Sequence, residues 1–131
     1  MSKLPPRLGQ VQLQIMQALW ERGEATARQI TEDLSCAQPI AHSTVQTLLR
    51  QMEAKGAITH DASDRVFVFR PLFQRSEISE TAARDLLTRV FQGSVYGLVA
   101  HLLRHERISP EERRRLRELI DRADAAEGER P

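Results

Sequence analysis

The sequence predicts a mainly α-helical fold with a small β-hairpin wing, namely a winged helix-turn-helix domain followed by a helical dimerisation region. The first observation is the order of the elements. Three short segments with helical periodicity precede two short segments rich in β-branched and aromatic residues. The second observation is a further run of amphipathic helical segments after this hairpin. We therefore assign residues 1–72 to the winged-helix domain and residues 73–131 to the dimerisation region.

The three N-terminal helical segments have recognisable boundaries. The first spans residues 10–22, and Gly23 is well placed to end it. Thr26 and Gln29 have the spacing of a capping box, which predicts the start of a short second helix. The third segment spans about residues 42–55. The spacing of these segments is that of three short helices joined by tight connections.

A β-hairpin is predicted immediately after the third helix. Residues 57–60 form the first strand signal, and the run Asp61–Asp64 is rich in residues that favour turns. Residues 65–70 have dense β-branched and aromatic content, and Pro71 is expected to end the second strand. We therefore expect a two-stranded wing whose turn comprises Asp61–Asp64.

The third helical segment has the pattern of a helix that enters the major groove of DNA. One face is apolar and is expected to pack inward. The opposite face has short polar and basic side chains, which suit a groove whose base edges present hydrogen-bond donors and acceptors. The inward face comprises Val45, Leu48, Leu49 and Met52.

The candidate DNA-binding residues are those of the polar face and one residue of the hairpin. An arginine can contact guanine through two hydrogen bonds or hold a phosphate, and a threonine can place its methyl group against thymine. Backbone amides at a helix start favour a phosphate, and Ser43 and Gln46 lie near the start of this helix. These candidates are Ser43, Thr44, Gln46, Thr47, Arg50 and Arg65.

Four of these six assignments have a purely structural alternative. Ser43 and Gln46 also have the spacing of a capping box. Arg50 has acidic neighbours, Glu53 and Glu21, with which it can form an exposed ion pair. Arg65 can equally be part of the hairpin surface. The residue types alone leave these alternatives open.

The later helical segments expose more apolar surface than three short helices can bury among themselves. A second copy of the chain would cover this surface, and packing against the first domain is the alternative. Ser109 and Pro110 mark the start of the last helix. The expected dimerisation residues are Leu86, Val90, Phe91, Val95, Leu98, Val99, Leu102, Leu116, Leu119 and Ile120.

Composition limits the possible functions without selecting one. The net charge is only +1, although residues 1–75 contain nine Lys and Arg residues against seven Asp and Glu residues. This low charge keeps open a winged helix that binds only proteins, or a regulator that senses a small molecule or a metal. We find neither a signal peptide nor an apolar stretch of about twenty residues, so we expect a cytoplasmic protein without membrane contact.

We identify no catalytic, cofactor-binding or metal-binding site in the sequence. The single cysteine, Cys36, cannot form an intrachain disulfide, and no group orients it together with His42 for catalysis. His101 and His105 lie four residues apart, a spacing that can bind zinc or nickel. Two histidines are an incomplete site, so we expect them to be exposed or to lie at a dimer interface.

Five stretches have a more specific resemblance. They are LQIMQALW (13–20), TVQTLL (44–49), KGA (55–57), RVFVF (65–69) with a following proline, and FQGS (91–94). In order and spacing they resemble the penicillinase-repressor (BlaI/MecI) family. The resemblance implies a homodimeric repressor of β-lactamase or related resistance genes, with a winged helix that binds a palindromic operator of double-stranded DNA. It also implies that Thr44 and Thr47, with Ser43 and Arg50 beside them, face the bases.

The sequence departs from that family's pattern in two ways. Antibiotic-resistance members are inactivated by a sensor-linked protease at an Asn-Phe bond, and the resemblance places His101 and Leu102 at this position. A sensor-linked protease is therefore a possible partner whose usual cleavage site is altered here. Copper-responsive relatives have paired Cys-x-Cys motifs near the C-terminus, which this sequence lacks.

Overall fold

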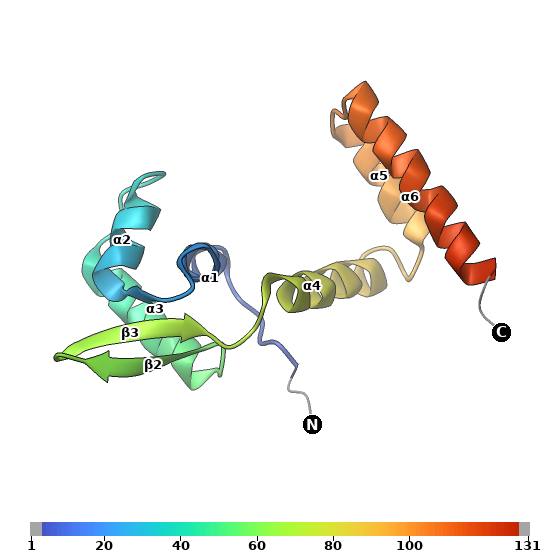
Figure 1. Ribbon diagram of the computed structural model, residues 1–131. Helices are drawn as coiled ribbons and strands as arrows, with labels where there is room; N and C mark the ends of the chain where they lie inside the picture. The colour runs from blue at the N-terminus through green and yellow to red at the C-terminus, as the bar shows by residue number, and fades with distance from the viewer. Residues whose placement is uncertain (1–3, 129–131) are drawn as a thin grey trace. The chain divides into compact units, whose positions relative to one another are not determined.

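The computed structural model describes residues 4–128, and the side chains of 126–128 are left aside. The chain divides into two compact units, Met1–Asp85 and Leu86–Pro131 (Figure 1). The first contains three complete helices and a small sheet, the second contains two complete helices, and a further helix is divided between them. The boundary falls within α4 (Arg75–Arg89). The predicted class, a mainly α-helical winged helix-turn-helix followed by further helices, is confirmed.

The three N-terminal helices are α1 (Gln10–Arg22), α2 (Ala27–Ser35) and α3 (His42–Ala54). α1 ends at Gly23, whose positive φ of 83° lets its N–H donate back to the carbonyl of Leu19. The predicted capping box begins α2. The Gln29 N–H donates to Thr26 Oγ1 at 3.2 Å, and the Thr26 N–H donates to Gln29 Oε1 at 2.9 Å. Both of these sequence predictions are confirmed.

The sheet has three antiparallel strands in the order β1-β3-β2. They are β1 (Ala25–Thr26), β2 (Ile58–Ser63) and β3 (Val66–Pro71). We call β2, β3 and their connecting turn the wing. β1 was not predicted, because two residues are too short to show a strand period, and Thr26 also serves as the cap of α2. Figure 1 shows the wing beside the three helices.

The turn of the wing is shorter than the sequence predicted. Residues Asp61–Ser63, expected in the turn, continue β2, and Ser63 pairs with Val66. Only Asp64 and Arg65 connect the strands, with φ values of 50° and 68°. Two positive φ values are typical of the tight turn that matches the twist of a hairpin. Arg65 therefore lies in the turn and not in the strand, and Pro71 is the last residue of β3, paired with Ile58.

One hydrophobic core holds the three helices to the sheet. The inward face of α3 behaves as predicted at Val45, Leu49 and Met52, which are almost completely buried, while Leu48 is half-buried at the edge. Burial of this face fixes the rotation of α3 about its own axis. The core comprises Ile15, Met16, Leu19, Ala25, Ile30, Val45, Leu49, Met52, Ala57, Ile58 and Phe69.

Polar contacts hold the elements around this core. The Trp20 Nε1–H donates to the carbonyl of Phe73 at 2.8 Å, and the guanidinium of Arg75 lies 5.3 Å from the Trp20 ring centre. Arg22 and Asp33 join α1 to α2 through two hydrogen bonds of 2.7 and 2.8 Å. The hydrogen bond from Arg22 lowers the pKa of the Asp33 carboxyl below its ordinary value of 3.8.

The second unit contains α5 (Val95–His105) and α6 (Pro110–Gly128). Gly93, with a φ of 81°, separates α4 from α5. The predicted start of α6 is confirmed, because the Glu112 N–H donates to Ser109 Oγ at 3.1 Å and Pro110 is the first helical residue. No helix in the described residues is long and apolar enough to cross a membrane.

We predict that Thr26→Ala lowers the free energy of unfolding by about 1 kcal/mol, because the variant loses the hydroxyl that caps α2. Thr26→Ser keeps a hydroxyl in the same place and is the matched control. Denaturant unfolding of the two variants and the wild type measures the difference. Equal destabilisation of both variants would show that the methyl group of Thr26, and not its cap, is what matters.

Candidate nucleic-acid interface

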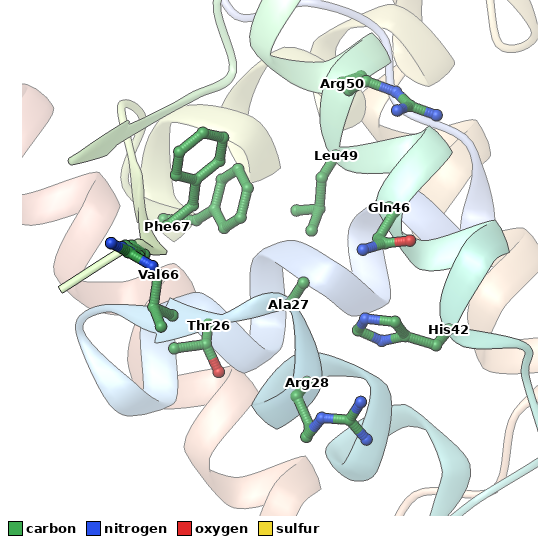
Figure 2. Close-up of a pocket in the computed structure, with 11 residues that line it drawn as sticks. Thr26, Ala27, Arg28, His42, Gln46, Leu49, Arg50, Val66 and Phe67 are labelled. Atoms are coloured by element: carbon green, nitrogen blue, oxygen red, sulfur yellow. The ribbon is translucent and has the colours of Figure 1, made fainter. Parts of the chain in front are cut away.

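The candidate interface is a cleft between α3, the start of α2 and the wing (Figure 2). Its volume is about 560 Å³. Side chains of Leu49 and Phe69, which belong to the core, form part of its lining. The residues that line the cleft are Thr26, Ala27, Arg28, His42, Gln46, Leu49, Arg50, Arg65, Val66, Phe67 and Phe69.

The charge of this cleft has one sign. Arg28 comes from α2, Arg50 from α3 and Arg65 from the turn of the wing, and His42 begins α3. None of the described residues that line the cleft is a carboxylate. The net charge of +1 therefore conceals a local basic surface. Such a surface is suited to a polyanion such as the DNA backbone.

The polar face of α3 lies in solvent beside the cleft. The predicted residues Ser43, Thr44, Gln46, Thr47 and Arg50 are all exposed, and Gln46 and Arg50 also line the cleft. Arg65, the sixth predicted residue, lies in the exposed turn of the wing. The structure thus brings Gln46, Arg50 and Arg65 to one cleft. The other three predicted residues lie on α3 but do not line the cleft. The contact of all six residues with bases or phosphates stays a prediction.

The two structural alternatives for the α3 residues are absent from the described residues. The N-cap of α3 is Ala41, with no side-chain cap hydrogen bond, so the interpretation of Ser43 and Gln46 as a capping box is wrong. Arg50 forms no ion pair with Glu53 or Glu21 within residues 4–128. Its Nη2 lies 3.4 Å from Thr47 Oγ1 instead. The Thr47 hydroxyl in turn donates to the carbonyl of Ser43 at 3.0 Å.

A contact between α3 and the wing holds the two sides of the interface together. Nδ1 of His60, on β2, lies 2.8 and 2.7 Å from the two carboxylate oxygens of Glu53, on α3. The same imidazole stacks on the ring of Phe67, with 4.2 Å between ring centres. This contact gives the wing a fixed anchorage on α3. It explains why Glu53 does not pair with Arg50.

Sequence reasoning missed four residues of this site. Glu53 and His60 meet only because the chain folds back after α3, and their separation of seven residues is not a recognisable motif. Arg28 lies inside the capping box of α2, and His42 precedes the polar stripe of α3. A search for basic residues in the first turn of each predicted helix would have found both.

The second unit exposes an extensive apolar surface. None of the described side chains of α5 is fully buried. Of the ten predicted dimerisation residues, Phe91 and Leu98 are half-buried, and the other eight are exposed, with Ile120 the most open at 66%. Tyr96 and Leu103, which are not among these ten residues, are 84% and 51% exposed.

His101 and His105 are close on the exposed side of α5. Their ring centres are 4.3 Å apart, and Nδ1 of His105 hydrogen-bonds the carbonyl of His101 at 2.9 Å. No group of three or more His, Cys, Asp or Glu residues in the described chain is placed to hold a metal ion. These two histidines therefore lack a third ligand within their own described chain.

Comparison with known proteins gives a consistent result. The family model described as the penicillinase repressor matches residues 8–122. The chain is 26% identical over 121 residues to the penicillinase repressor of Bacillus licheniformis, covering 92% of this chain and 94% of that relative. It is 32% identical over 133 residues to the transcriptional regulator BlaI of Mycobacterium tuberculosis (strain H37Rv), covering 100% of this chain and 94% of that relative.

Two solved structures match part of the chain. The solution structure of the DNA-binding domain of the repressor BlaI has a TM-score of 0.51 and 28% identity, over 59% of this chain and 93% of that one. The monomeric form of Bacillus licheniformis BlaI in complex with the blaP half-operator has a TM-score of 0.50, with the same identity and coverage.

Proposed function

Because the chain belongs to the penicillinase repressor family, we propose that it is a DNA-binding transcriptional repressor that acts as a homodimer on a palindromic operator. The family model covers residues 8–122, so the membership extends over both units. Its relatives are named as repressors and regulators of transcription. One relative of known structure binds a half-operator, as expected if each protomer of a dimer reads one half of a palindrome.

The observation that carries the proposal is the uniformly basic cleft beside the polar face of α3. An α-helix fits the major groove of B-DNA, and a second element beside it can reach the flanking backbone. The core holds α3 by its apolar face, so the opposite face is free for DNA. The His60–Glu53 contact fixes the wing on the same helix.

We assign the residues of α3 to two roles. Thr44, Thr47 and Arg50 face the base edges, where Arg50 suits guanine and the threonine methyl groups suit thymine. Ser43 and Gln46, near the start of the helix, contact a phosphate. The hydrogen bond from Arg50 to Thr47 holds the arginine along the helix in the free protein.

Arg65 has a different role in this proposal. It lies in the two-residue turn at the tip of the wing, on a different element from the polar stripe of α3. A long cation at a hairpin tip suits the DNA backbone or the minor groove. We therefore assign Arg65 to phosphate binding without base selection.

The exposed apolar surface of the second unit supports the homodimer. Val95, Leu119 and Ile120 are each about 60% exposed, and they come from both helices of this unit. Large apolar side chains exposed in this number on two short helices indicate an interaction site. A two-fold dimer would bury it and would place the two α3 helices in major-groove faces about 34 Å apart.

Repression in this account follows from occupancy of the promoter, and release follows from anything that weakens the dimer. In the family, a sensor-linked protease cuts an Asn-Phe bond. The corresponding pair here is His101–Leu102, inside α5. The carbonyl of Leu102 accepts a hydrogen bond from the N–H of Glu106 at 2.8 Å. Because this pair differs from the family's Asn-Phe pair, our proposal does not include cleavage at this bond.

Selection of bound sequences from random duplex DNA tests the proposed function. The selected duplex is then titrated with the full chain at several salt concentrations. We expect a palindromic sequence and an affinity that falls steeply with salt, because each phosphate contact releases counterions. No enrichment and no salt-dependent binding would contradict the proposal and would favour a winged helix that binds only proteins.

We predict that Arg50→Ala and Thr47→Ala each weaken binding to the selected duplex by about 1–3 kcal/mol, because each removes a base contact. Both variants should also tolerate substitutions in the duplex that the wild type rejects. Gln17→Ala, at an exposed position of α1, is the control and should bind as the wild type does. Unchanged affinity in both α3 variants would refute the assignment of this face.

We predict that Arg65→Gly weakens DNA binding while leaving the fold as stable as before or more stable. Glycine tolerates the φ of 68° at this position, but it lacks the cation. The loss of affinity should be similar for all duplexes, and the salt slope should fall by about 1. Asp64→Gly is the matched control, since it relaxes the same turn and removes an acidic group. Weaker binding by Asp64→Gly would show that turn flexibility causes the loss.

We predict that Ile120→Glu shifts the chain from dimer to monomer, because a carboxylate would be buried in the apolar interface. Binding to the full palindrome should fall by more than tenfold, whereas binding to a half-site should not change. Sedimentation and operator titration measure the two effects. Asp121→Arg is the control, because helical periodicity places Asp121 away from the apolar stripe formed by Leu116, Leu119 and Ile120. A dimer that persists in Ile120→Glu would exclude this surface as the interface.

A further inference from the structure

His42 has an oriented imidazole that the proposed function does not yet use. It is the first residue of α3, and its side chain is half-buried in the lining of the cleft. Nδ1 of the ring lies 2.9 Å from Oγ1 of Thr31, on α2. The Thr31 hydroxyl donates its proton to the carbonyl of Ala27 at 2.8 Å. With this proton directed at the carbonyl of Ala27, Nδ1 of His42 is the donor to Oγ1.

These two hydrogen bonds leave Nε2 as the ring nitrogen that can gain or lose a proton. With a proton on Nδ1, Nε2 is a bare acceptor in the neutral ring and a charged donor in the protonated ring. Figure 2 shows the ring of His42 directed into the cleft between Gln46 and Arg28. A proton on Nε2 would therefore place a further positive charge in the cleft.

The charged groups that line the cleft together with this ring are all basic. Arg28 faces the cleft from α2, Arg50 from α3 and Arg65 from the turn of the wing. The cleft has no carboxylate among its described residues that could hold the ring protonated without DNA. Glu53, the one acidic residue of α3, contacts His60 rather than His42. An anion that stabilises a protonated His42 must then come from a ligand.

We propose that His42 takes up a proton from solvent when operator DNA binds, and that its Nε2–H donates to a phosphate oxygen of the DNA backbone. This inference rests on the proposed function. A phosphate beside Nε2 favours the charged ring and is repelled by the lone pair of the neutral ring. Operator affinity is therefore coupled to pH in the range in which histidine titrates, about pH 5 to 8.

The linkage has a definite sign. Binding that takes up a proton is strengthened as the pH falls, until the ring is charged in the free protein as well. We expect the full chain to bind the selected duplex several-fold more tightly at pH 6 than at pH 8. Calorimetric titration at pH 7 in buffers with different ionisation enthalpies should show a net uptake of protons, at most about one per protomer.

Three variants separate this role from a merely structural one. His42→Gln should lose the proton uptake and the pH dependence. His42→Arg should bind at pH 8 about as tightly as the wild type binds at pH 6, with no proton uptake, because its charge is permanent. Thr31→Val removes the acceptor that orients Nδ1 and should reduce the pH dependence.

His60→Gln separates proton uptake from the anchorage of the wing: it removes the contact with Glu53 and should weaken binding, but it should keep the proton uptake. Equal proton uptake in His42→Gln and the wild type would overturn the proposal, as would pH-independent binding of the wild type. Both of these results leave the proposed function intact. A wild-type chain that binds no duplex at any pH would overturn the proposed function and this inference with it.

Discussion

The burial of one face of α3 is the constraint on which the rest of the interface depends. Val45, Leu49 and Met52 are each at most 1% exposed, so α3 cannot rotate about its axis without exposing core side chains to water. This packing determines which residues face outward, and it does so without any direct interaction among them. The basic and polar residues of the opposite face thus point outward whether or not they also contact one another, as Arg50 and Thr47 do. Side chains on that face remain free to meet a ligand.

The wing adds a second fixed surface to this helix. A hairpin of two short strands is marginal alone, but here β1 extends it to three strands, and its base lies in the core at Ile58 and Phe69. His60 then joins it to Glu53 of α3. Two anchored elements with a basic cleft between them form a preorganised site, which loses less entropy on binding than a flexible one. The local charge of this cleft explains how a chain of net charge +1 suits a polyanion.

Local signals in the sequence predicted most of the fold and selected three of the residues that line the cleft. Helical periodicity located α1 and α3, and the caps at Thr26 and Ser109 have their predicted hydrogen bonds. The features that were missed depend on contacts between distant elements. β1 exists only because β3 lies beside it, and Asp61 belongs to a strand because Val68 pairs with it, although its residue type favours a turn. His42 acquires a role only through Thr31 of another helix.

In the proposed complex, α3 of each protomer lies in the major groove of one half of a palindrome. Methylation protection of guanine N7 tests it directly, since this atom lies on the floor of the major groove. The measurement uses the full chain bound to its selected duplex. We expect two protected groups of guanines that are related by a two-fold axis and separated by one helical turn, which is about 34 Å. Unprotected N7 atoms throughout a bound duplex would contradict it, because the chain would then be reading the backbone or the minor groove alone.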